Sequence, residues 1–326
     1  MAIPIWKDHS VTIGTAEEVE YSIYLGSDNT GALIYTGKAY RKPGASSVSV
    51  RINDICTSYL RQSLSLLFSS EDDSIDESAA LRQTFSIYAG TKVEEVEFFY
   101  CWDYETSADP NAALRHYPIV DHIQPGMRVP LTVNRTMVAG DLEVSAYIGG
   151  TETDSYTNTE TGPVNMFLRA PSVDSGRLAI MLTEPFEASA HYTMVPACHR
   201  WALYYVNAAG AWDVLLIEGK DRKTDIYKPS SYRRDYDNAS ELGRGEVVYL
   251  NDITRTWELH TGWLTDAQAG RMHHLLGSTL VYLCDLTDDS LRPVAITNKD
   301  CPTKTHKDGM VSYRIDVRLQ RDIIRR

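Results

Sequence analysis

The chain has 326 residues, of which 43% are hydrophobic and 23% are charged, as in a folded globular protein large enough for two cores. Its formal net charge of −12 argues against nonspecific binding to nucleic acid, which needs a basic surface. No stretch approaches the roughly 18 consecutive apolar residues of a membrane helix, and the first residues lack the pattern of a secretory signal. We therefore expect a protein made in the cytoplasm, without a signal peptide and without a membrane partner.

The charge is divided unevenly along the chain. Residues 1–165 hold 11 Lys+Arg and 23 Asp+Glu, a net of −12, whereas residues 166–326 hold 21 of each. An acidic half joined to a neutral half indicates two domains with different neighbours. The stretch 149–163 is polar and rich in Thr and Gly, which is typical of a linker or of a long exposed hairpin loop. We place the boundary there, between an acidic β-rich domain (1–163) and a second domain (164–326).

The first half is predicted to be β-rich. Short runs of residues that favour strands alternate with turn residues, and a sequence pattern of this kind is typical of a β-sandwich. A short helix, 54–60, is predicted after Asn53, and an acidic loop occupies 69–78. The eight predicted strands are 11–14, 21–25, 33–40, 48–52, 84–89, 94–102, 128–133 and 142–148.

The second half begins with predicted strands at 164–169 and 177–182. A hairpin follows, because two apolar runs, 200–207 and 212–219, are joined by a loop of the length that hairpins favour. Further strands are expected at 246–250 and 254–259. The final strand, 312–320, alternates apolar and polar residues without a break, which is the pattern of a half-buried strand.

One helix is predicted in this half, over about 265–277. Thr265 and Gln268 have the spacing of a capping box, in which each side chain bonds to the other residue's backbone N–H. Ala269, Met272 and Leu275 then recur on one helical face. Gly277 is expected to end the helix in a left-handed conformation. The predicted fold is mainly β, with two β-sandwich-like domains, the second of which carries this single flanking helix.

The histidines and cysteines do not form a recognisable site. His273 and His274 are adjacent on the predicted helix, so their side chains are expected to diverge by about 100° and not to share a metal ion. The five cysteines are odd in number, widely spaced and without a CxxC pair, unlike a disulfide framework or a zinc site. A Cys/His site can be assembled on paper, but no spacing supports it; its members would be Cys198, His199, Cys284, Cys301 and His306.

Motifs of known chemistry are also missing from the sequence. The acidic run 71–77 lacks the glycine and the ligand spacing of a calcium loop. The chain contains no phosphate-binding glycine loop, no hydrolase nucleophile motif and no metalloprotease motif. We therefore predict no catalytic residues, no metal ion and no cofactor, and we expect that the protein is not an enzyme.

The segment 220–238 is charged, rich in tyrosine and without clear periodicity, which indicates an extended surface segment or arm. Planar side chains interleaved with arginine are able to stack on nucleic acid or on sugar rings. Because the chain is acidic overall, an arm that orders against a neighbouring subunit is favoured. We expect a deletion of 220–240 to preserve the fold and to weaken assembly. The residues proposed to make contact are Tyr227, Tyr232, Arg233, Arg234 and Tyr236.

The residues of the C-terminal part resemble a known group of proteins. HisArgTrpAlaLeuTyrTyrValAsn at 199–207, TrpAspValLeuLeuIleGluGly at 212–219 and the block GluLeuHisThrGlyTrpLeuThrAspAlaGln at 258–268 are similar to segments of virion and tail-associated proteins of Bacteroides-type phages and prophages. The resemblance covers roughly residues 199–326. It implies a structural tail or baseplate component, and because the shared patterns concern packing, it identifies no functional residues.

Two functions from different classes follow as hypotheses. The first is a phage virion protein of the tail or baseplate that associates with itself, as a ring or another homo-oligomer, and with other virion proteins. The second is a module that binds carbohydrate or a cell surface, such as a host glycan, through its many Tyr and Trp residues. A hydrolase is a third class, for which the sequence offers no set of residues.

Overall fold

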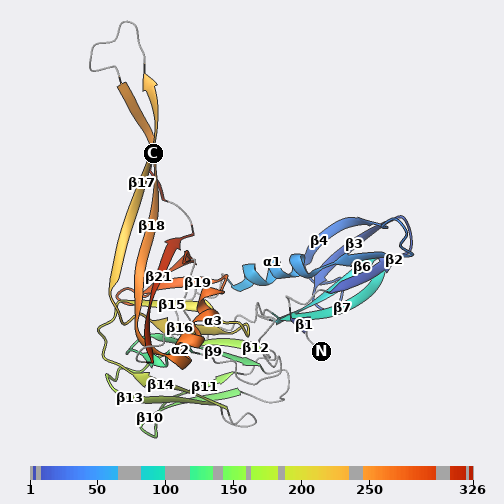
Figure 1. Ribbon diagram of the computed structural model, residues 1–326. Coiled ribbons are helices and arrows are strands. Elements are labelled where there is room, and N and C mark those ends of the chain that lie inside the picture. Colours follow the sequence, from blue (N-terminus) through green and yellow to red (C-terminus); the bar gives the residue numbers. More distant parts are fainter. Residues whose placement is uncertain are drawn as a thin grey trace. The chain divides into compact units, whose positions relative to one another are not determined.

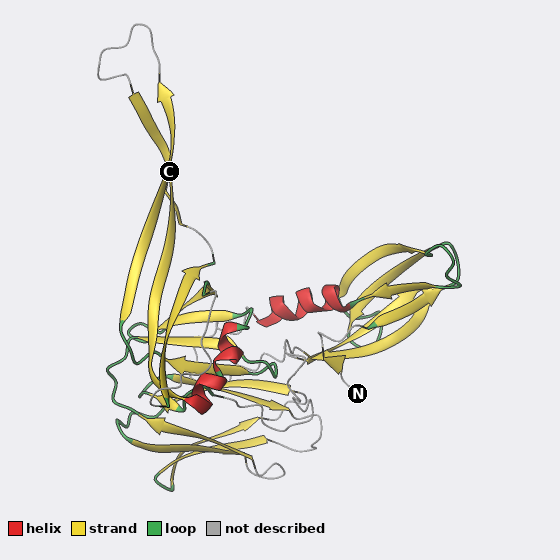
Figure 2. Ribbon diagram, in the orientation of Figure 1, coloured by secondary structure: helices red, strands yellow, loops and turns green. Residues whose placement is uncertain are grey.

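The computed structural model describes residues 3–4, 9–64, 82–99, 118–134, 142–158, 163–182, 188–234, 245–298, 309–320 and 323–325 (Figure 1). Strands predominate and helices are few, so the predicted mainly-β fold class is confirmed (Figure 2). The chain forms two compact units: unit 1 comprises Met1–Ala197 with Tyr205–Val214, and unit 2 comprises Cys198–Tyr204 with Leu215–Arg326.

The N-terminal part of unit 1 contains a five-stranded sheet in the order β1-β7-β6-β3-β4. Strands β2 and β5 form a separate antiparallel pair, and the helix α1 (Asn53–Leu64) follows β5. Strand β2 contacts β3, β6 and β7, and α1 contacts β6, so the core lies among these elements. The strands are β1 (Ile3–Pro4), β2 (Ser10–Gly14), β3 (Glu18–Leu25), β4 (Leu33–Tyr40), β5 (Val48–Arg51), β6 (Arg82–Ala89) and β7 (Thr91–Phe99).

Alternating side chains of these strands form the core. Ile23, Phe85 and Ile87 are completely buried, and Ile23 and Ile87 lie opposite each other in the register of β3 and β6. From α1, Cys56 and Leu60 are also buried. The helix predicted over 54–60 is therefore present and extends further along the chain.

The remainder of unit 1 contains a second five-stranded sheet, in the order β11-β10-β13-β14-β8, and an antiparallel pair, β9 with β12. The strands are β8 (His122–Ile123), β9 (Arg128–Asn134), β10 (Leu142–Ile148), β11 (Thr151–Asn158), β12 (Pro163–Arg169), β13 (Gly176–Leu182) and β14 (Ala188–Met194).

The polar stretch that suggested a linker or hairpin loop forms mostly strand. Gly149 and Gly150 have φ values of 58° and 87°, which glycine adopts without steric cost, and they connect β10 to β11 in a tight turn. Strand β11 lies at the end of its sheet, so its polar residues pair through the backbone without being buried on both faces. The boundary expected after residue 163 consequently lies inside unit 1.

Unit 2 is built on an eight-stranded sheet in the order β16-β15-β19-β20-β21-β18-β17, with β22 also paired to β18. The hairpin β15–β16 confirms the one predicted from the sequence, and its tip is part of unit 1. All residues from Trp201 to Ile217 are buried. The strands are β15 (Trp201–Val206), β16 (Trp212–Leu216), β17 (Asp221–Arg234), β18 (Gly245–Thr265), β19 (Val281–Asp285), β20 (Ser290–Ile296), β21 (Met310–Leu319) and β22 (Ile323–Arg325).

The predicted single helix is two short helices, α2 (Asp266–Gly270) and α3 (Met272–Leu276), separated at Arg271. The capping box is confirmed, since Thr265 Oγ1 accepts from the Gln268 backbone N–H and Gln268 Oε1 accepts from the Thr265 N–H. The prediction for Gly277 is wrong, because its φ of −83° is right-handed. Its N–H donates to the His273 carbonyl at 3.0 Å, so the last turn closes without a left-handed residue.

Candidate interaction surface

The segment predicted to be an arm is one strand of a long antiparallel hairpin. Strands β17 and β18 pair from Asp221↔Leu259 to Arg234↔Gly245, well beyond the usual strand length of about 5–6 residues. Strand β21 pairs with β18 only from Thr256 onward, and β22 pairs with residues 251–253. The two strands thus continue past β21 as a ribbon (Figure 1). We call residues 226–234 and 245–254 the arm.

The arm exposes large apolar side chains. Tyr227 and Tyr232, both predicted contact residues, have 60% and 45% of their surface exposed. Arg233 and Arg234 lie in β17, where the structure does not describe their side chains, and Tyr236 lies outside the described residues. Among the arm residues whose side chains the structure describes, the exposed large apolar ones are Ile226, Tyr227, Tyr232, Val248 and Tyr249.

Three of these residues were not identified from the sequence: Ile226 lies in the predicted arm but was not proposed to make contact, and Val248 and Tyr249 lie on the opposite strand. The register of the hairpin shifts between Ser230 and Ser231, where β18 contains one extra residue. This β-bulge leaves Tyr249 without a paired residue, and its ring lies 6.0 Å from that of Tyr232. The run 246–250 has the composition of an ordinary strand, and no local signal in it predicts that Val248 and Tyr249 are exposed.

The base of the arm is fixed by buried and charged contacts. Arg255 on β18 donates two hydrogen bonds to Asp225 on β17, at 2.8 and 2.9 Å, across the hairpin. Trp257 is 1% exposed, and its ring lies 6.2 Å from that of Trp201 in an edge-to-face arrangement. Trp201 Nε1 in turn donates to Asp221 at 2.9 Å. These contacts give the arm a rigid starting point.

The free edge of β17 is poorly suited to adding another strand. β17 is the last strand in the order of its sheet, and it contains Pro229, which has no N–H to donate. Lys223 and Lys228 on the same strand are exposed, and charged side chains of this kind discourage edge-to-edge pairing. The faces of the arm, rather than its edge, are therefore available for contact.

A second β-bulge lies further along β18, within the part of the strand that pairs with β21. His260 pairs with Arg314 and Trp263 pairs with Ser312, so β18 contains one extra residue between them. Gly262 has a φ of 79°. Thr261 Oγ1 accepts a hydrogen bond from the Tyr313 N–H at 3.1 Å. Beyond the bulge Trp263 is 71% exposed.

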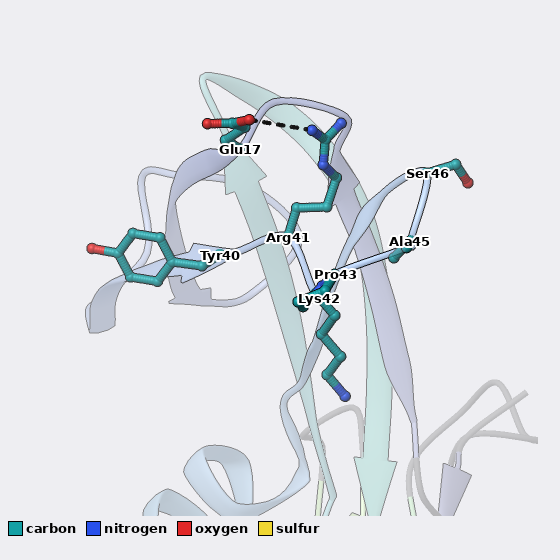
Figure 3. Close-up of a pocket in the computed structure, with 8 residues that line it drawn as sticks. Glu17, Tyr40, Arg41, Lys42, Pro43, Ala45 and Ser46 are labelled. Atoms are coloured by element: carbon teal, nitrogen blue, oxygen red, sulfur yellow. Dashed lines mark ion pairs between the residues drawn. The ribbon is translucent and has the colours of Figure 1, made fainter.

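A shallow hollow lies on the N-terminal sheet, around the turn after β4 (Figure 3). It measures about 720 Å³ and is lined by Glu17 and residues 40–46. Glu17 and Arg41 form an ion pair of 3.5 Å at its edge, but the carboxylate side chain is 91% exposed, and exposed ion pairs stabilise little. Tyr40 and Lys42 point in different directions (Figure 3). This arrangement does not bring reactive groups together.

The expected divergence of His273 and His274 is wrong. Their ring centroids lie 4.1 Å apart, because rotation about the side-chain bonds brings the rings together although the Cα–Cβ directions differ. His273 Nδ1 lies 2.7 Å from the Gly270 carbonyl and therefore donates to it, while His274 is buried. Among the described residues, no group of three or more His, Cys, Asp or Glu side chains is placed to hold a metal ion.

The cysteines considered for a Cys/His site are not brought together in the part of the chain that the structure describes. Cys284 is buried and Cys198 is exposed, and neither forms a disulfide within the described residues. Burial raises the pKa of the Cys56 thiol, in α1, to about 12. Cys301 and His306, like the acidic run 71–77, lie outside the described residues.

Comparison of the sequence with protein-family models and with curated proteins gave no significant match. Within the described ranges, no helix has both the length and the apolar character needed to cross a membrane.

Proposed function

We propose that this chain is a structural subunit of a phage or prophage particle, in its tail or baseplate, and that it acts through contacts between subunits. The observation that carries the proposal is the arm, the part of the β17–β18 hairpin that extends past β21, on which Ile226, Tyr227, Tyr232, Val248 and Tyr249 are exposed. The resemblance of residues 199–326 to tail-associated proteins supports the same class of function.

Covering the exposed apolar side chains of the arm would favour assembly. An isolated two-stranded hairpin is only marginally stable in water, and burying one Ile or Tyr side chain contributes roughly 1.5–3 kcal/mol. A neighbour that covers Ile226, Tyr232 and Tyr249 would therefore stabilise both the arm and the assembly. Contacts that repeat head to tail and close produce a ring.

A shortened arm tests this proposal. Deletion of 220–240 alone would remove all of β17 and leave β18 without that partner along its whole length in the arm, so both strands must be shortened together. Replacing residues 230–250 with Asn-Gly joins Pro229 to Asn251, which are opposite each other, through a two-residue turn. We expect a folded protein with a lower assembled mass. A matched control is Tyr40→Ser, which changes a tyrosine that is 65% exposed in unit 1. An unchanged mass after shortening would refute the role of the arm.

The place of the protein in a particle requires a separate experiment. Particles purified from cells that carry the gene are analysed by mass spectrometry, and an antibody to this chain is located on them by electron microscopy. We expect the chain in the particles and the antibody at the tail. Its absence from particles, or labelling of the head alone, contradicts the proposal.

A carbohydrate- or surface-binding module is the second candidate function. Tyr227, Tyr232 and Tyr249 are exposed on the arm, and tyrosine rings offer both an apolar face and a hydroxyl for sugar recognition. Binding of the purified protein to a set of host glycans, lost when the three tyrosines are replaced with Ser, would favour this function. The absence of binding to every glycan would remove it.

A further inference from the structure

The exposure of Trp263 is a consequence of the second bulge, in the part of β18 that pairs with β21. On β18, Trp257 and Leu259 face the core and are at most 1% exposed, and strict alternation would direct residue 263 to the same side. The extra residue shifts the phase, so Leu264 is buried at 1% and Trp263 is 71% exposed. Bulges commonly redirect a side chain at functional positions. A large aromatic side chain turned outward in this way is suited to anchor a contact.

The side chains around Trp263 define one surface. Residues directly opposite each other in a sheet share a face, and the register of β17, β18 and β21 places one set of polar residues on the same face as Trp263. Met310, 46% exposed, occupies the position diagonal to it. We call this set the outer face; besides Trp263 and Met310, its charged or titratable members are Arg222, Glu258, His260, Arg314, Asp316 and Arg318.

We propose that two copies of this chain associate through their outer faces and arms, with Trp263 and Met310 as an apolar anchor at the end of the contact away from the arm. This inference rests on the proposed function, and it names a second copy of the chain as the partner that the arm and the adjoining sheet contact. The contact joins the copies about a two-fold axis, so that the same surface is used on both.

The charge of the outer face favours a second copy as the partner. Each chain carries a net charge of −12, so two copies repel each other over most of their surface. The described outer face has three arginines against the two carboxylates of Glu258 and Asp316, with the neutral or cationic His260 beside them. Cations and anions alternate on it, and Arg314 pairs with Asp316 at 2.8 Å. A surface of mixed sign and almost zero net charge can face its own copy without repulsion.

The size of the face shows why the arm is needed. Three strands about 4.8 Å apart and ten residues long, at about 3.4 Å per residue, cover roughly 480 Å², and β21 has ten residues. A standard interface buries about 800 Å² per partner. The arm supplies the remaining area, and because a two-stranded ribbon twists along its length, apolar residues on both of its sides reach one neighbour. Tyr227 and Tyr232, five residues apart on β17, then serve the same contact.

The test is the mass of the full chain in solution, measured by light scattering over a range of concentrations. We expect an even multiple of 36.6 kDa, since a two-fold contact pairs the copies. Trp263→Glu places a charge in the apolar anchor of the contact and is expected to raise its dissociation constant roughly 10- to 100-fold. Tyr40→Glu is the matched control, because it adds the same charge at a 65% exposed aromatic residue of another sheet, and we expect it to leave the mass unchanged.

Different results separate this inference from the proposed function. A monomer at every concentration, an odd number of copies, or a Trp263→Glu mass equal to that of the wild type overturns the two-fold contact. If the shortened arm then still abolishes assembly, the proposed function stands without this contact. If neither variant changes the mass of an assembled wild type, both are refuted. Circular dichroism confirms that each variant is folded, and Trp263→Ser repeats the test without a new charge.

Discussion

Two glycines meet at the bulge that exposes Trp263, and we predict that they are required for different reasons. Gly262 has a φ of 79°, and a Cβ added there would lie 3.4 Å from the Glu218 Cβ, an ordinary contact. At Gly219 a Cβ would lie 2.6 Å from both the Cβ and the carbonyl oxygen of His260. The Gly219 N–H also donates to that carbonyl at 2.9 Å. Gly262 is therefore needed for its conformation and Gly219 for its lack of a side chain.

The two requirements give different energies. Gly262→Ala is expected to lower the free energy of unfolding by about 1–2 kcal/mol, the cost of a left-handed residue with a Cβ. Gly262→Asn should lower it less, because Asn tolerates this conformation. Gly219→Ala must push the connection between β16 and β17 away from His260 on β18, to which it is hydrogen-bonded, and is expected to cost about 1–3 kcal/mol. Gly219→Asn should cost more than Gly219→Ala, since a larger side chain meets the same obstacle.

Urea unfolding followed by tryptophan fluorescence measures these costs, because Trp201 and Trp257 are buried in unit 2. The deciding comparison is the order of the Ala and Asn variants, which should be opposite at the two positions. The same order at both positions, or a Gly219→Ala variant as stable as the wild type, would refute the reasoning. Because Gly262 sets the phase of the strand, Gly262→Ala should also change the exposure of Trp263 to a soluble quencher.

Three further predictions concern other parts of the molecule. Thr265→Ala removes the helix cap and should cost about 1 kcal/mol of stability in urea unfolding, whereas Thr265→Ser, which keeps the hydroxyl, should cost less. Burial, and secondly the hydrogen bond with Tyr35, raises the pKa of Tyr21 to about 12. In an absorbance titration, Tyr35→Phe should lower the pKa of Tyr21. The stability that Tyr21 contributes is fully present below pH about 10 and should be lost as the pH rises toward about 12. Alkylation followed by mass spectrometry should modify the exposed Cys198 at neutral pH and leave Cys56 protected; rapid labelling of Cys56 would contradict its burial.

Features decided by neighbouring residues were predictable from the sequence. The capping box of α2 depends on Thr265 and Gln268, which are three residues apart. The alternation in β21 depends on the pleat of one strand. In both cases residues close together in the sequence determine the local structure, so the sequence pattern predicts it directly.

Features decided by distant pairing were not predictable. The exposure of Tyr249 and of Trp263 depends on one extra residue relative to a partner strand, and no short stretch of sequence shows which strand that partner is. The turn at Gly149–Gly150 converts a polar stretch into β11 because β10 offers it a partner. Arg271 interrupts the predicted helix although the apolar stripe continues across it.

Association of this protein with its own copies can be tested directly. Purified full-length protein is passed over a sizing column with light scattering at increasing concentrations, and the main peak is imaged by electron microscopy. We expect a closed particle whose mass is an even multiple of 36.6 kDa. A single species of 36.6 kDa at every concentration would contradict self-assembly and would give priority to the glycan-binding function.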